Sequence, residues 1–99
     1  MTADEVLRAV TELRPDVVLL DLNMPELKGL DACRQIRRAN PQTGIVILTG
    51  TNDVEIQEKA FSLGASGYVL KHLMSQELVG AIQRALLGDK VISCREDRG

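Results

Sequence analysis

The sequence predicts an α/β domain in which a parallel sheet carries helices on its faces. Short apolar runs of strand length alternate with amphipathic segments of helix length, in the order α-β-α-β-α-β-α. The runs at residues 16–21 and 44–50 are apolar without alternation, which is typical of strands covered on both faces. Strands that are joined through helices run parallel with right-handed crossovers, so this order predicts one layer of parallel strands between helices.

The first predicted helix is marked at both ends. Thr2 and Glu5 have the spacing of a capping box, and apolar residues at helical spacing predict a helix over about residues 3–13. Pro15 ends this helix, because the residue before a proline avoids the helical conformation. The sequence DVVLLD, residues 16–21, then predicts the first buried strand.

A second helix and a second strand are predicted to follow. Apolar spacing favours a helix over about residues 29–39, which the Asn-Pro pair ending at Pro41 breaks. GIVILTG, residues 44–50, is a second continuous apolar run and predicts a buried strand. Asn52 followed by Glu55 has the pattern of a helix start, so a third helix is expected from there.

The last third of the chain repeats the alternation once more. Gly64 fits the glycine that follows the C-terminus of a helix, and GYVL, residues 67–70, predicts the third strand. Ser75 is expected to cap a last helix over about residues 76–87. Residues 91–99 hold a short apolar piece and then charges, and we expect a linker or tail there.

Composition excludes several classes of protein. A chain of 99 residues with 44% hydrophobic and 26% charged residues predicts one ordinary globular domain. The net charge of −2 comes without a basic stripe, so direct nucleic-acid contact is not expected. The apolar runs are far shorter than the roughly 20 residues of a membrane helix, and no signal core precedes them, so a cytoplasmic protein is expected. Cys33 and Cys94 fit no metal or disulfide spacing and are expected to be reduced thiols.

Three side chains of different chemistry stand at the ends of the three predicted strands. The first strand ends in Asp21, the second ends in Thr49, and Lys71 follows the third. Ligands of an open parallel sheet bind beyond these carboxyl ends. A carboxylate can be the nucleophile that forms an aspartyl-phosphate, whose oxygens need a cation and a hydroxyl donor nearby. Gly50 leaves room for a phosphoryl group, and the backbone carbonyl of Asn23 is expected to help hold a hard cation such as Mg²⁺.

In this order and spacing, the motifs resemble the receiver domain of bacterial two-component response regulators. The resemblance rests on DVVLLDLNMP with Asp21, ILTG with Thr49, and GASGYVLK with Tyr68 and Lys71, and Gly29 fits a glycine of the loop after the phosphorylated residue. The sequence GASGYVLKHLMSQELVGAIQRALLG is most similar to the NarL-type subgroup, whose members carry a C-terminal DNA-binding domain. The resemblance implies a flavodoxin-like fold, a phosphoacceptor at Asp21, a switch made of Thr49 and Tyr68, and Mg²⁺ as cofactor.

The resemblance covers residues 1–90 and lacks the first part of the family's fold. A complete receiver begins with a strand, a helix and a second strand, roughly 30–40 residues in all, and its first strand ends in adjacent acids that hold Mg²⁺. This sequence opens on the second helix, where Asp4 and Glu5 are interpreted as helix N-terminal charges. We therefore expect an N-terminally truncated receiver without effector domain, a three-stranded sheet in the family order 3-4-5, an open edge at residues 17–20 and an incomplete Mg²⁺ site.

Three functions remain open at this point. The first is a signalling module that accepts phosphate on Asp21 from a histidine kinase and switches the face formed by residues 53–87; beyond self-phosphorylation and self-dephosphorylation it is not an enzyme. The second is a receiver fragment that is not phosphorylated and binds a partner strand or a second copy, as a homodimer, beside residues 17–20. The third, a haloacid-dehalogenase-type phosphohydrolase, needs a second Asp where this sequence has Asn23. His72, the single histidine, is expected to be a surface residue.

Overall fold

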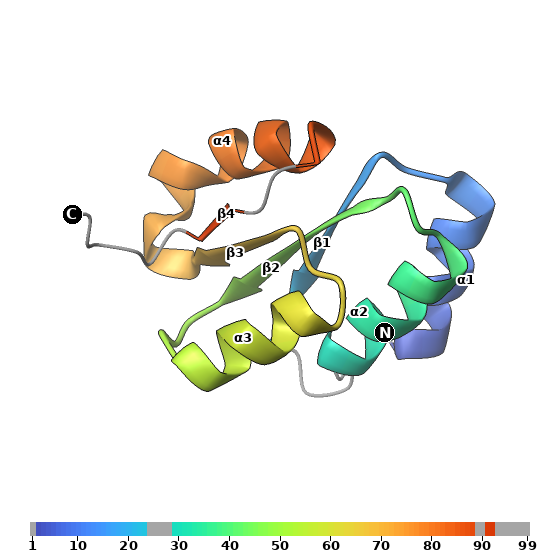
Figure 1. Cartoon of the computed structure of the whole chain (residues 1–99), viewed down its shortest axis with the longest axis horizontal. Coiled ribbons are helices and arrows are strands. Elements are labelled where there is room, and N and C mark those ends of the chain that lie inside the picture. Colours follow the sequence, from blue (N-terminus) through green and yellow to red (C-terminus); the bar gives the residue numbers. More distant parts are fainter. Residues whose placement is uncertain (1, 24–28, 89–90, 93–99) are drawn as a thin grey trace.

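Helices and strands alternate along the chain as the sequence predicts (Figure 1). The computed structural model describes residues 2–23, 29–88 and 91–92. The bounds of the elements are α1 Ala3–Leu13, β1 Val17–Asp21, α2 Gly29–Ala39, β2 Gly44–Thr49, α3 Val54–Ser62, β3 Gly67–Leu70, the 3-10 turn η1 Lys71–Leu73, α4 Met74–Leu86 and β4 Val91–Ile92.

The sheet is parallel throughout, in the order β1-β2-β3-β4. The register of β1 on β2 sets Asp21 opposite Leu48, and that of β2 on β3 sets Thr49 opposite Leu70. The carboxyl ends of the first three strands therefore meet at one end of the sheet. This arrangement confirms the predicted parallel order of the three strands.

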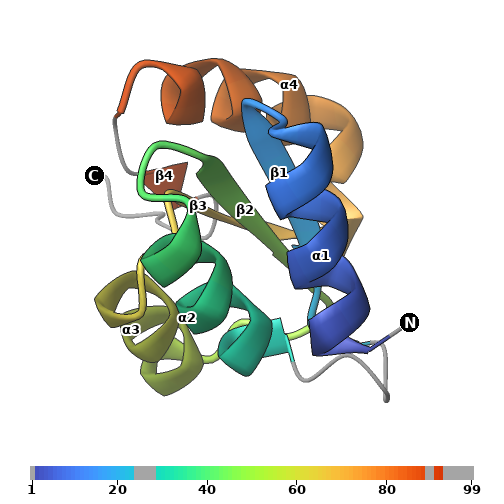
Figure 2. The same ribbon diagram turned by 90° about the vertical axis from the view of Figure 1, so that its right-hand side faces the viewer.

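Two layers of helices enclose the sheet, which confirms the predicted α/β sandwich. Figures 1 and 2 show α4 on one face and α1, α2 and α3 on the other. Because side chains alternate along each strand, the sheet has a separate core on each face. The larger core lies under α1, α2 and α3, and the smaller one, under α4, consists of Val46, Val69, Ala81 and Ala85. None of the described helices is long and apolar enough to span a bilayer.

The start of α1 confirms the predicted capping box, whereas the predicted caps of two later helices are wrong. The backbone N–H of Thr2 donates to Glu5 Oε1 (2.7 Å), and the N–H of Glu5 donates to Thr2 Oγ1 (3.2 Å). The N-cap of α3 is Asp53, not Asn52, because the Asp53 carboxylate accepts the free N–H groups of the first turn. Ser75 lies inside α4, which continues directly from η1 and has no side-chain cap.

A fourth strand corrects the prediction of a three-stranded sheet. Val91–Ile92 pairs in parallel with β3, within the segment 91–99 that the sequence analysis assigned to a linker or tail. Because α4 lies on the opposite face from α2 and α3 while the strand order continues in one direction, the connection through α4 has the opposite hand from the other two crossovers. Two residues are too few for a recognisable strand pattern. Residues 93–99, with Cys94, lie outside the described residues.

The predicted open edge at β1 is confirmed within the described part of the chain. The carbonyl of Asp16 and the N–H of Leu22 both bond to β2, at 2.8 and 2.9 Å. Backbone groups alternate in direction along a strand, so those of Val17, Leu19 and Asp21 face the open side. Leu19 is 44% exposed, which makes this edge both unpaired and apolar.

Candidate functional site

The predicted carboxylate and the predicted lysine meet at the carboxyl end of the sheet. Lys71, the first residue after β3, places its Nζ 2.7 Å from Oδ2 of Asp21 at the end of β1. Since β2 lies between these strands, the lysine side chain reaches across the end of β2. The side chains of Lys71 and Asp21 are 39% and 28% exposed, so solvent screens the pair, which contributes about 0.5–1 kcal/mol to stability.

Both oxygens of the Asp21 carboxylate are bonded. Oδ1 accepts a hydrogen bond from the backbone N–H of Asn23, at 2.8 Å. The hydrogen bond from Lys71 is the largest cause of the lowered pKa of Asp21; partial burial, the next largest, opposes it, and the N–H of Asn23 lowers the pKa further. The carboxylate is therefore ionised at neutral pH, which is the form that a nucleophile needs.

The end of β2 brings a hydroxyl and a backbone N–H to this end of the sheet. Thr49 is buried, and its Oγ1 accepts the N–H of Thr51 at 3.2 Å and lies 3.3 Å from the Thr51 hydroxyl. The exposed Gly50 donates its N–H to Oδ1 of Asn23, at 2.8 Å. Among the described residues, a Cβ at Gly50 would meet only that oxygen, at 3.5 Å, and the predicted approach of a phosphoryl group past Gly50 stays a prediction.

Tyr68, the predicted switch aromatic, is fully buried on β3 in the larger core. Its hydroxyl donates to the backbone carbonyl of Thr51, at 3.3 Å. Thr51 thereby connects Thr49 to Tyr68, a role that was not predicted from the sequence. The only signal in the sequence is a second hydroxyl two residues after Thr49. The role of these residues as a switch stays a prediction.

Three other residues named in the sequence analysis are His72, Met24 and Pro25. His72 lies exposed in η1, as expected. Met24 and Pro25, which carry part of the resemblance, lie outside the described residues.

The residues that the structure describes supply only part of a Mg²⁺ site. Mg²⁺ needs a near-octahedral set of oxygen ligands. Both oxygens of Asp21 already accept hydrogen bonds, from Lys71 and from Asn23. Within the described residues, no group of three His, Cys, Asp or Glu side chains is placed to hold a metal ion. Within that part of the chain, Asp21 and the carbonyl of Asn23 are too few ligands, and the chemistry of the site is derived from Lys71 and the N–H donors alone.

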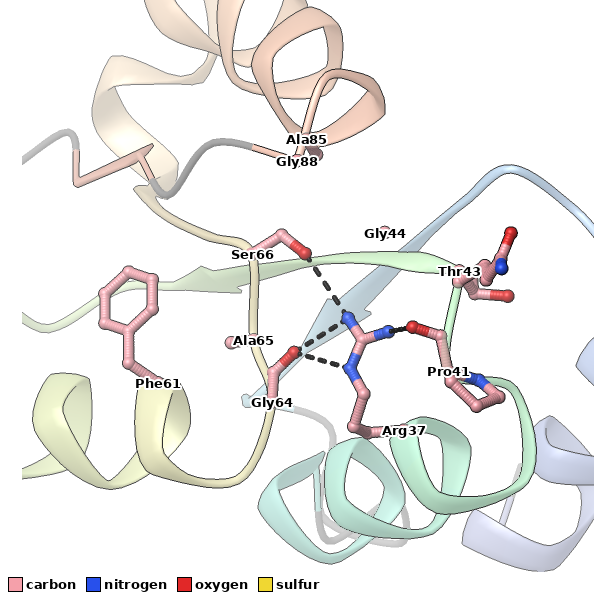
Figure 3. Close-up of a pocket in the computed structure, with 11 residues that line it drawn as sticks. Arg37, Pro41, Thr43, Gly44, Phe61, Gly64, Ala65, Ser66, Ala85 and Gly88 are labelled. Atoms are coloured by element: carbon pink, nitrogen blue, oxygen red, sulfur yellow. Dashed lines mark hydrogen bonds between the residues drawn. The ribbon is translucent and has the colours of Figure 1, made fainter.

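A cavity of about 400 Å³ lies at the other end of the sheet, before β2 and β3, and is separate from this site (Figure 3). Arg37 of α2 points into it and donates to the carbonyl of Gly64 at 2.9 and 3.1 Å, to Oγ of Ser66 at 3.4 Å, and to the carbonyl of Pro41. The guanidinium is thus engaged by neutral acceptors of the protein. It joins α2 to the loop between α3 and β3 rather than offering an anion site.

Comparison with known proteins identifies the family. Residues 1–83 match the response regulator receiver domain, so the chain belongs to this family. Transcriptional regulatory protein YdfI of Bacillus subtilis is 39% identical over 85 residues, which cover 86% of this chain and 39% of YdfI. Response regulator GacA of Pseudomonas aeruginosa is 34% identical over 90 residues, which cover 91% of this chain and 42% of GacA.

A solved structure agrees with the same assignment. The two-component response regulator of the LuxR family from Aurantimonas sp. is 38% identical, with a TM-score of 0.87 over 95% of this chain and 67% of that one. The predicted receiver family, its flavodoxin-like fold and the likeness to the NarL and LuxR type of regulator are therefore confirmed. The chain spans about two fifths of the length of the curated relatives named above.

Proposed function

We propose that Asp21 accepts a phosphoryl group from a histidine kinase, so that this chain works as the phosphoacceptor module of a two-component system. The observation that carries the proposal is the Asp21 carboxylate held between Lys71 and the N–H of Asn23. In the transfer, an oxygen of Asp21 bonds to phosphorus while the P–N bond of the donor's phosphohistidine breaks, and the electron pair leaves on the imidazole. Asp21 is an acceptor here, and the chain remains a signalling module.

Lys71 is the residue that stabilises the negative charge on the phosphoryl oxygens in this reaction. The negative charge of the carboxylate passes to the phosphoryl oxygens, and a flexible lysine can follow it as a compact cation. Backbone N–H groups at the same end of the sheet, on Asn23 and Gly50, supply further donors. Mg²⁺, which the family resemblance implies, would need carboxylates beyond the described residues.

The signal would leave the site through Thr49. A phosphoryl oxygen draws the Thr49 hydroxyl, which then releases the N–H of Thr51. Because the Thr51 carbonyl is the acceptor of the buried Tyr68 hydroxyl, movement of this loop changes how Tyr68 sits against the face formed by residues 53–87. YdfI is named a transcriptional regulatory protein and GacA a response regulator. We propose that this face controls a DNA-binding part of a longer protein.

Phosphorylation by acetyl phosphate tests the proposal directly. The wild-type chain, incubated with acetyl phosphate with and without Mg²⁺, is expected to gain the mass of one phosphoryl group. Asp16→Asn, at an exposed acid just before β1, is expected to gain it equally, and Asp21→Asn is expected to gain none. An unmodified wild-type chain, or an Asp21→Asn variant that is modified as fully as wild type, contradicts the proposal.

The open edge of β1 supports a second candidate, a module that binds another strand or a second copy of itself. The outward backbone groups of Val17 and Asp21 and the exposed Leu19 favour the addition of a strand. The expected result is a mass in solution that rises with concentration in wild type and not in Leu19→Lys. Val79→Lys, an exposed position on α4, is the matched control and should behave as wild type. A wild-type chain that stays monomeric at all concentrations rules this candidate out.

A further inference from the structure

We infer that the side chain of Asn23 competes with a phosphoryl group on Asp21 for one hydrogen-bond donor. That donor is the backbone N–H of Gly50, which Oδ1 of Asn23 now accepts. The inference deepens the proposed function and rests on it. Its observation is the hydrogen bond from the N–H of Gly50 to Oδ1 of Asn23, at 2.8 Å. Asn23 is thus a positioning residue that sets how readily the site receives an anion.

Asn23 bonds both the end of β1 and the loop after β2. Its backbone N–H donates to Oδ1 of Asp21, and its side-chain oxygen accepts from Gly50 in the loop after β2. An uncharged oxygen, two residues along the chain from the bonded carboxylate of Asp21, therefore accepts the N–H of Gly50. The exposure of Asn23 and Gly50 lets this side chain rotate into water without disturbing the core.

The other donors at the site are differently placed. Lys71 and the N–H of Asn23 already bond the carboxylate of Asp21, and they can follow its charge onto a phosphoryl group. The N–H of Gly50 is available only after the carboxamide of Asn23 has left. A charged phosphoryl oxygen is the stronger acceptor, so the exchange is favourable, but it starts from an occupied donor.

A merely structural role for Asn23 predicts the opposite result. If the carboxamide only kept the loop in order, its removal would loosen the site and weaken anion binding. If the carboxamide competes with the anion, its removal strengthens anion binding by about twofold to tenfold, the factor that corresponds to one neutral hydrogen bond. The sign of the change in affinity therefore separates the two roles.

The test uses Asn23→Ala, Asn23→Asp and, as matched control, Asn52→Ala in the exposed part of the next loop. Hydrogen exchange of the Gly50 amide, followed by NMR, is expected to speed up about twofold to tenfold in Asn23→Ala and not in Asn52→Ala. Beryllofluoride with Mg²⁺, titrated against the same amide, should bind Asn23→Ala more tightly by a similar factor. It should bind Asn23→Asp more weakly, because that carboxylate keeps an acceptor and adds a like charge.

The outcomes separate this inference from the proposed function. Unchanged Gly50 exchange in Asn23→Ala, or weaker binding of beryllofluoride than in wild type, overturns the inference. Faster Gly50 exchange with no response of any variant to beryllofluoride overturns the phosphoacceptor function and leaves the bond between Asn23 and Gly50 established. A response in Asn23→Ala that exceeds that of wild type supports both.

Discussion

Replacing Lys71 by methionine tests the electrostatics of the site, because the side chain keeps its length and loses its charge. Lys71 Nζ lies 2.7 Å from Oδ2 of Asp21 and is the main cause of the lowered pKa of that carboxyl. We expect the pKa of Asp21 to rise in Lys71→Met, although the N–H of Asn23 still lowers it. Since both side chains are partly exposed, the expected loss of stability at neutral pH is about 0.5–1 kcal/mol.

The sign of the pKa shift fixes how this loss depends on pH. A carboxyl whose pKa is lower in the folded than in the unfolded state stabilises the fold above its unfolded pKa, near the ordinary value of 3.8 for Asp21. That stabilisation disappears as the pH falls through the lower, folded pKa. The unfolding free energies of wild type and Lys71→Met are therefore expected to differ at neutral pH and to converge in acid.

Urea unfolding at a series of pH values measures this difference. A double-mutant cycle with Asp21→Asn isolates the contribution of the pair to the free energy of unfolding. A difference that is equal at neutral and acid pH would refute the reasoning. So would a cycle in which the two substitutions are simply additive at neutral pH.

Three further predictions concern the rest of the fold. Gly64→Ala should lower the free energy of unfolding, measured in urea, by at least about 1 kcal/mol, because Gly64 has φ +113° and a Cβ would lie 2.5 Å from Cγ of Arg37. Gly80→Ala is the control: a Cβ there meets no described atom within 4 Å, so the free energy of unfolding should rise by about 0.5–1 kcal/mol. Arg37→Met should lower the free energy of unfolding by about 1–3 kcal/mol, because the carbonyl of Gly64 loses its hydrogen-bond donor. Arg38→Ala, at an exposed position, should change it little, and equal losses in the two variants would contradict the role of Arg37. Burial raises the pKa of Cys33 to about 11, so iodoacetamide should modify it in urea and hardly in the native chain, as peptide masses will report.

The part of the site that follows from strand order could be predicted from the sequence. Asp21, Thr49 and Lys71 each stand at or directly after the end of an apolar run, and parallel strands bring such ends together. In the structure, Lys71 contacts Asp21, and among the described residues a Cβ at Gly50 would meet only Oδ1 of Asn23. These positions depend on the main chain of the sheet, which continuous apolar patterns specify well.

The contacts that depend on loop paths could not be predicted. Thr51 joins Thr49 to Tyr68 only because the loop after β2 turns its carbonyl toward the buried hydroxyl. The partners of Arg37 in the loop before β3 are likewise distant in sequence. Short or ambiguous signals account for the other differences. Two residues carry no strand period at β4, and neighbouring Asn and Asp side chains both suit the N-cap that Asp53 occupies.

The most direct test of the phosphoacceptor function is to locate the phosphoryl group chemically. An acyl phosphate on an aspartate is reduced by borohydride to the alcohol, so a peptide that contained phospho-Asp21 will contain homoserine at that position. After treatment with acetyl phosphate and borohydride, peptide mass spectrometry is expected to find homoserine at residue 21. Unreduced aspartate at residue 21 in a chain that has gained a phosphoryl group elsewhere would contradict the account.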